Sequence, residues 1–138
     1  MATLEEFGVL LQINDQLFRL VRNMRQNANE YTSLATAIDA GTAPAGMTVV
    51  KLAETMKADA ERFQTRLSTI TQLAQRNQTL VQNALAIIGV TLASANATKN
   101  ALVAVAQHTQ AATLTTTNQC RTEAAYILAN TPGFDGAF

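Results

Sequence analysis

The chain has 138 residues, of which 48% are apolar and 14% are charged, and its ten basic residues balance its ten acidic ones. This length suits one domain with a packed core, and the zero net charge does not favour binding to polyanions or to membrane surfaces. A single cysteine, Cys120, excludes a disulfide within the chain. The aromatic residues are five Phe, two Tyr and no Trp, so alanine and aliphatic side chains must supply most of the core.

The first expected helix covers residues 4–39. It opens on Thr3-Leu4-Glu5-Glu6, a capping-box pattern in which the two acids also lie near the positive end of the helix dipole. These acids stand where a secretory signal needs basic residues, so no signal segment is expected. Two glycines and a proline in residues 40–47 predict a linker after the helix. Along this first helix, apolar residues recur at intervals of seven, at Leu10, Leu17, Met24, Tyr31 and Ile38.

A second helix is expected over residues 48–93, with Thr48 as its N-cap. It keeps the seven-residue period through Met56, Phe63 and Ile70, which indicates coiled-coil-like packing. The same period places the polar Asn77 at a core position. Two interpretations of Asn77 stay open: it fixes the register of the helix packing, or it marks a kink or a local rotation of the apolar face.

A third helix is expected over residues 98–129, after a turn at 94–98 with Asn96 or Thr98 as its cap. Its pattern is weaker because β-branched threonines cluster at residues 113–117. An alternative interpretation takes residues 86–92 and this threonine run as strands. The predicted fold is therefore one all-α domain over residues 1–138, an elongated bundle or hairpin of three long helices with a C-terminal tail at 131–138.

Residues 81–120 contain one formal charge, Lys99. Polar residues interrupt every apolar window here, so no membrane span is predicted. Neutral, small outer faces instead suggest contact with other chains, and the alternative is a monomer with an uncharged surface. The tail could dock on a neighbouring subunit or fold back on its own chain. The residues predicted at an interface are Ala104, Thr113, Thr116, Phe134 and Phe138.

Three arginines, Arg19, Arg22 and Arg25, form a basic ridge on the side of the first helix away from its apolar residues. Such a ridge could contact nucleic-acid phosphates or an acidic protein. The alternative is a solvated face, or one that forms ion pairs with acids of a neighbour. No aromatic residues alternate with the arginines as a stacking surface for bases would require.

Residues that carry chemistry are few. His108 is the one histidine, which excludes a metal site built on two histidines, and we expect it to be a hydrogen-bonded polar side chain. Cys120 is expected to be structural, and no phosphate-binding glycine motif occurs. The sequence therefore predicts no catalytic residue, no metal ligand and no cofactor, and hence a protein that is not an enzyme.

The segment KADAERFQTRLSTITQLAQRNQTLVQNALAIIG and the neutral stretch after it resemble small helical structural proteins of tailed bacteriophage virions, which form rings, connectors or internal core parts. The resemblance implies a multi-copy virion subunit without catalysis, assembled in the bacterial cytoplasm and attached to other structural proteins. Outside that setting a cytoplasmic protein is expected. The alternatives are a small helical binding module that uses the arginine ridge, and an exported helical filament subunit.

Overall fold

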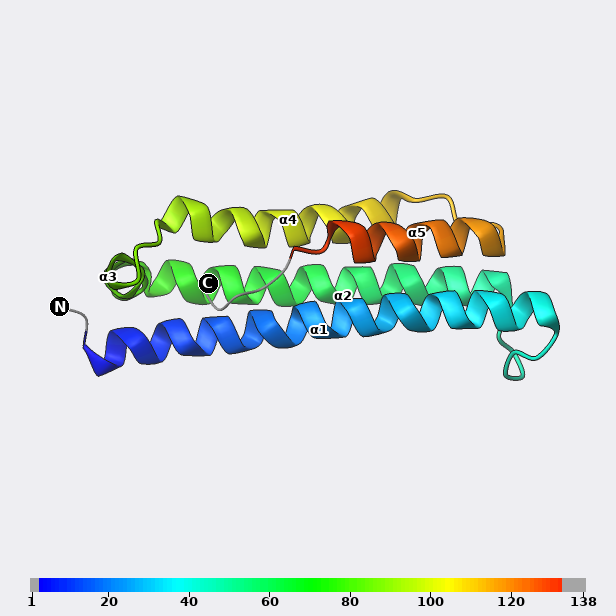
Figure 1. Cartoon of the computed structure of the whole chain (residues 1–138), viewed down its shortest axis with the longest axis horizontal. Helices are drawn as coiled ribbons and strands as arrows, with labels where there is room; N and C mark the ends of the chain where they lie inside the picture. Colours follow the sequence, from blue (N-terminus) through cyan, green and yellow to red (C-terminus); the bar gives the residue numbers. More distant parts are fainter. Residues whose placement is uncertain (1–2, 133–138) are drawn as a thin grey trace.

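The computed structural model describes residues 3–132, and all regular secondary structure in that range is helical. Its helices are α1 (Leu4–Ala40), α2 (Val49–Arg76), α3 (Gln78–Ile87), α4 (Leu92–Ala111) and α5 (Thr117–Asn130). Helices α1, α2, α4 and α5 run alternately in opposite directions as an elongated bundle, and the short α3 lies across one end (Figure 1). The predicted all-helical fold is confirmed, but residues 3–132 form five helices in place of the three long ones that were predicted.

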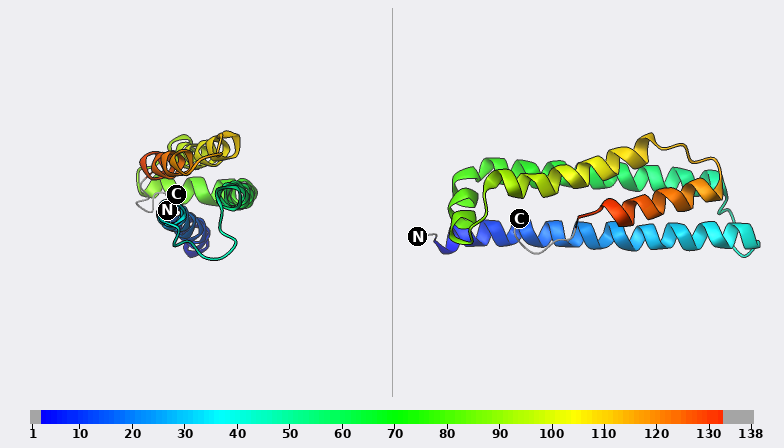
Figure 2. Two further views of the ribbon diagram at one scale, coloured as in Figure 1. Left: turned by 90° about the vertical axis from the view of Figure 1, so that its right-hand side faces the viewer. Right: turned by 45° about the horizontal axis from the view of Figure 1, so that its top comes forward.

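The four long helices have a simple neighbour relationship. Helix α1 packs against α2 and α5, whereas α4 packs against the same two helices from the corner diagonally opposite α1 (Figure 2). Because α5 is much shorter than α1, it covers only part of the length of α1.

The first helix matches its prediction closely. The hydroxyl of Thr3 accepts a hydrogen bond from the backbone N–H of Glu6 at 3.2 Å, and that of Thr48 accepts from the N–H of Lys51 at 3.2 Å. These are the two predicted N-caps. Helix α1 ends at Gly41, whose φ of 73° is the left-handed conformation that glycine adopts without steric cost.

The prediction of one helix over residues 48–93 is wrong. The helix breaks at Asn77, whose side-chain amide donates to the carbonyl of Leu73 at 2.9 Å and so competes with regular helix hydrogen bonding. The helical conformation is interrupted a second time at Gly89, where φ is 75°. The axes of α3 and α4 are bent by 109° relative to each other. Of the two interpretations of Asn77, the structure shows the kink.

The prediction of a turn at residues 94–98 is also wrong, since Asn96 and Thr98 lie inside α4. The cap is Thr91, whose hydroxyl accepts from the N–H of Ser94 at 3.1 Å. The threonine run does not continue the helix: Thr116 and Gln119 form a reciprocal capping box that starts α5. No strand forms within residues 3–132.

The buried core follows the predicted seven-residue period in α1 and α2. Fully buried large side chains include Ile13, Leu17, Leu52, Leu67 and Leu102. Alanines fill many of the remaining core positions, which allows the helices to pack closely.

Candidate functional site

The outer surface from α3 to the start of α5 carries no formal charge. The single charged residue between Val81 and Cys120 is Lys99, and its side chain is buried, with 3% exposure. Exposed residues of α4 instead follow a 4-3-4-3-4 spacing along one outward stripe, which we call the α4 face. Its members are Ala93, Ala97, Asn100, Ala104, Gln107 and Ala111.

Three of the predicted interface residues lie on this uncharged surface. Ala104 is exposed in the middle of the α4 face, Thr113 is exposed in the connection to α5, and Thr116 is exposed as the N-cap of α5. The other two, Phe134 and Phe138, lie outside the described residues. The structure thus leaves the predicted positions of Ala104, Thr113 and Thr116 accessible to another chain.

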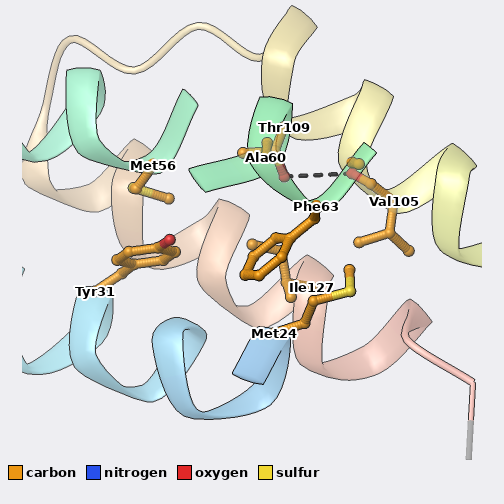
Figure 3. A pocket seen from close by; sticks show the side chains of 9 residues that line it. Met24, Tyr31, Met56, Ala60, Phe63, Val105, Thr109 and Ile127 are labelled. Atoms are coloured by element: carbon orange, nitrogen blue, oxygen red, sulfur yellow. Dashed lines mark hydrogen bonds between the residues drawn. The ribbon is translucent and has the colours of Figure 1, made fainter. Parts of the chain in front are cut away.

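Within residues 3–132, the cavity at the centre of the bundle is too small for a ligand. This cavity is lined by apolar side chains from four helices, including Met24, Met56, Phe63 and Ile127 (Figure 3). Its volume is about 10 Å³, which is close to the minimum for one water molecule. Thr109 lies at its edge, with its hydroxyl oxygen 3.3 Å from the carbonyl oxygen of Val105.

A buried carboxylate, Glu123, connects α5 to α4. It is 4% exposed and accepts from the Thr109 hydroxyl at 2.7 Å, and it lies 2.8 Å from Nδ1 of His108. The His108 ring stacks on Tyr126, with ring centroids 3.6 Å apart. His108 is therefore the hydrogen-bonded polar side chain that the sequence predicted. Glu123 was not among the residues predicted from the sequence, although it is the one acid between Glu61 and Asp135.

A second buried polar group connects α1 to α2. The Tyr31 hydroxyl donates to the carboxylate of Asp59, which also pairs with Arg62. Burial raises the pKa of Tyr31 above its ordinary value, so its hydroxyl stays protonated as a donor. Both polar groups hold helices together within the chain, and neither opens onto a pocket large enough for a substrate.

Two further contacts fix helix ends. The ammonium of Lys57 donates to the carbonyls of Gln110 and Ala112 at 2.8 and 2.7 Å, at the C-terminal end of α4. There its positive charge meets the negative end of the helix dipole. At the end of α1, hydrogen bonds from Thr117 and Arg121 lower the pKa of Asp39. These contacts define where α4 ends and where α5 begins.

The three arginines of the predicted ridge have different surroundings. Arg25 donates to the backbone carbonyl of Thr131 at 2.9 Å, which caps the end of α5. Arg19 pairs with Asp15 at 3.2 Å on the exposed surface, and Arg22 is exposed. Arg19 and Arg22 line a shallow groove of about 420 Å³ with Asp15, Phe18 and Asn23.

Lys99 lies beside a polar groove of about 330 Å³ between α2, α3 and α4, which also contains Gln75, Gln78, Asn96 and Asn100. Burial lowers the pKa of Lys99 to about 8.

Burial has the opposite effect on the Cys120 thiol, because it raises the pKa of that group. The raised pKa makes this cysteine poorly nucleophilic. No group of three His, Cys, Asp or Glu side chains able to hold a metal ion occurs in residues 3–132.

Comparison with protein-family models, with curated proteins and with solved structures found no match to this chain. Across the described helices, none is by itself long and apolar enough to cross a membrane. The pair α3 and α4 reaches that length and composition only when it is taken together across its 109° bend.

Proposed function

We propose that this chain is a non-enzymatic structural subunit that self-associates through the α4 face and the adjoining threonine connection, and that also attaches to other structural proteins. The observation that carries the proposal is the position of the charges. The exposed surfaces of α1 and α2 carry Asp15, Arg19, Glu61 and Arg66, whereas the one charge of residues 81–120 is directed inward. A helix face that remains in water normally carries Lys or Glu.

The chemistry of the α4 face supports contact with a second helix. Its alanines present only a methyl group, so another helix can approach to an interaxial distance near the lower end of about 8–10 Å. Asn100 and Gln107 lie among these alanines and can hydrogen-bond across such a contact without burying a formal charge. Association of this kind needs no charge pairing and depends on burial of apolar area.

The proposal extends to a component of a tailed-bacteriophage virion, assembled in the host cytoplasm. Its support is the resemblance of residues 57–89 and the neutral stretch that follows. Mass spectrometry of purified particles, with this chain present in many copies per particle, is the corresponding test.

Self-association is tested by size-exclusion chromatography with light scattering over a tenfold range of concentration. The variants are Ala104→Glu and Thr113→Lys, which place a charge on the proposed interface. The matched control is Ala58→Glu, because Ala58 is an exposed alanine on the charged surface of α2. Circular dichroism verifies that each variant keeps its helical content.

We expect the wild type and Ala58→Glu to form the same oligomer, and the two interface variants to fall to no more than two chains per particle. A wild-type monomer at every concentration would contradict the proposal. The proposal would also be contradicted if the Ala104→Glu and Thr113→Lys proteins both kept the oligomer mass of the wild type.

A further inference from the structure

The zero net charge of the chain conceals an unequal distribution of charge along the bundle. Residues 12–26 of α1 and 62–76 of α2 contain six of the seven arginines of the chain and one acid, Asp15. These two segments lie side by side, because both line one groove, which we call the α1–α2 groove. Its lining residues are Gln16, Arg19, Leu20, Arg66, Thr69 and Ile70. This stretch of the surface therefore has a local excess of positive charge.

The α1–α2 groove has an apolar floor and polar walls. Leu20 and Ile70 are 2% and 3% exposed, so they form its floor. Arg19 and Arg66 are exposed and come from opposite helices. The groove has a volume of about 270 Å³, and an amide and a hydroxyl side chain complete its lining. Two guanidinium groups that line one groove from opposite sides can hold the same oxyanion between them.

The arginines of this surface differ in how far the chain already uses them. Arg25 donates to the end of α5 and is therefore engaged within the bundle. Within residues 3–132, the side chains of Arg22 and Arg66 form no ion pair and donate no hydrogen bond. Asp15 contacts Nε of Arg19, and these two side chains are 58% and 73% exposed. Because such an exposed pair contributes little energy, Arg19 can also donate to a ligand through its Nη atoms.

The kind of basic residue favours phosphate as the ligand. The three lysines, Lys51, Lys57 and Lys99, all lie outside the two segments. Arginine presents a planar fork of donors that matches two phosphate oxygens, whereas lysine acts as a point charge. A protein partner normally buries accessible apolar or aromatic side chains at the centre of its contact. The apolar residues of this groove are already buried and its exposed lining is polar, so it suits a polyanion better than an acidic protein.

The spacing of the arginines suits the backbone of a nucleic-acid duplex. Arg19 and Arg22 are separated by about 4.5 Å along α1 at 1.5 Å per residue. Phosphates of one strand advance by about 3.4 Å along the duplex axis. A strand that follows α1 can therefore place one phosphate between Arg19 and Arg66 and a neighbouring phosphate at Arg22. Among the described residues, no aromatic side chain lines the groove, so it offers the bases of a single strand no stacking surface.

We propose that the α1–α2 groove binds the phosphate backbone of double-stranded nucleic acid, with Arg19 and Arg66 on one phosphate and Arg22 on the next. Phosphate contacts carry no sequence information, so binding is independent of sequence and weakens steeply as the salt concentration rises. The groove lies on α1 and α2, away from the α4 face, and the inference does not depend on self-association. Several copies held together on one duplex would bind it more tightly than one chain does.

The experiment measures the fluorescence anisotropy of a short labelled DNA duplex over a series of salt concentrations. We expect a dissociation constant of about 10⁻⁴–10⁻⁶ M at physiological salt, with equal values for duplexes of different sequence. The double variant Arg22→Gln/Arg66→Gln should weaken binding at least about tenfold at low salt and lower the salt slope by about one. Both arginines are exposed, so their replacement leaves the core intact, and circular dichroism verifies the helical content.

A matched control removes the same charge elsewhere on α2. Lys51 is exposed near the start of this helix, far along it from Arg66, so Lys51→Gln should bind the duplex like the wild type, whereas Arg66→Gln should bind it more weakly. Equal losses for these two variants would overturn the groove, because they would show a response to net charge alone. The absence of duplex binding at low salt would also overturn it.

Two further outcomes separate this inference from its alternatives. Poly-glutamate that displaces the duplex at an equal concentration of charges would overturn the assignment to nucleic acid and indicate an acidic protein. The same titrations with Ala104→Glu separate the groove from the α4 face. Duplex binding that depends on Arg22 and Arg66 in a chain that is monomeric even as wild type supports the groove and contradicts self-association. A wild-type oligomer that does not bind the duplex contradicts the groove alone.

Discussion

Replacement of Tyr31 by phenylalanine tests the buried contact between α1 and α2. The Tyr31 side chain is 3% exposed, and its hydroxyl donates to Asp59, which is itself 8% exposed. Phenylalanine keeps the ring and its packing, so the substitution removes one donor and opens almost no cavity. The carboxylate of Asp59 then keeps Arg62 as a partner but loses its hydrogen bond from α1.

The expected cost follows from the type of hydrogen bond. A bond to a buried charged group contributes about 1.5–3 kcal/mol. For a domain of this size, a loss of 1 kcal/mol lowers Tm by about 3–5 °C, so Tyr31→Phe should lower Tm by about 5–15 °C. Tyr126→Phe is the control, because within residues 3–132 the structure shows no hydrogen bond from the Tyr126 hydroxyl, and it should change Tm much less.

The pH dependence gives a second readout of the same contact. Burial raises the pKa of Tyr31, so above about pH 10 the unfolded chain releases the tyrosine proton while the folded chain retains it. The folded state then binds more protons, and the free energy of unfolding of the wild type should fall as pH rises. Urea titrations should show a weaker fall for Tyr31→Phe. Equal Tm values for Tyr31→Phe and Tyr126→Phe would refute this account of the contact.

Three further predictions concern Lys99 and the helix ends. Because burial lowers the pKa of Lys99 from 10.5 to about 8, the unfolded chain binds more protons between these pH values, so stability should rise with pH there. Lys99→Met should flatten that rise in urea titrations, and an unchanged slope would contradict the assignment. Gly89→Ala should cost about 1–2 kcal/mol because φ is 75°, and Gly89→Asn should recover part of the loss of Tm. Thr116→Ala should cost about 1 kcal/mol by removing the N-cap of α5, whereas Thr116→Ser should retain most of the stability; similar Tm values for both would exclude the cap.

The sequence predicted the helical class, α1 and most of the core, because these depend on period and on local caps. The seven-residue spacing of Leu10, Leu17 and Met24 corresponds directly to buried positions. The breaks were harder to predict because the period continues through them. Asn77 keeps the heptad position of a core residue while its side-chain amide donates to a carbonyl of its own helix, and Gly89 is a single glycine within an apolar run.

The contacts between distant helices could not be read from the sequence. Glu123 lies 15 residues from His108, and the pairing depends on how α4 and α5 turn toward each other after the threonine connection. Arg25 was interpreted as part of a surface ridge because its spacing from Arg19 and Arg22 is regular. Its hydrogen bond to Thr131 involves residues separated by 106 positions, which no local pattern reports.

The pairing of the first long helix with the last one has a consequence for synthesis on the ribosome. Arg25 meets Thr131 and Asp39 meets Arg121, so the core-facing side of α1 lacks one of its neighbours until α5 has emerged. Closing contacts across more than 80 residues is also slow compared with forming a helix. The nascent chain therefore exposes an apolar surface of α1 until α5 is synthesised. Chaperone binding and proteolysis should act on chains that end before α5 far more than on chains that include it.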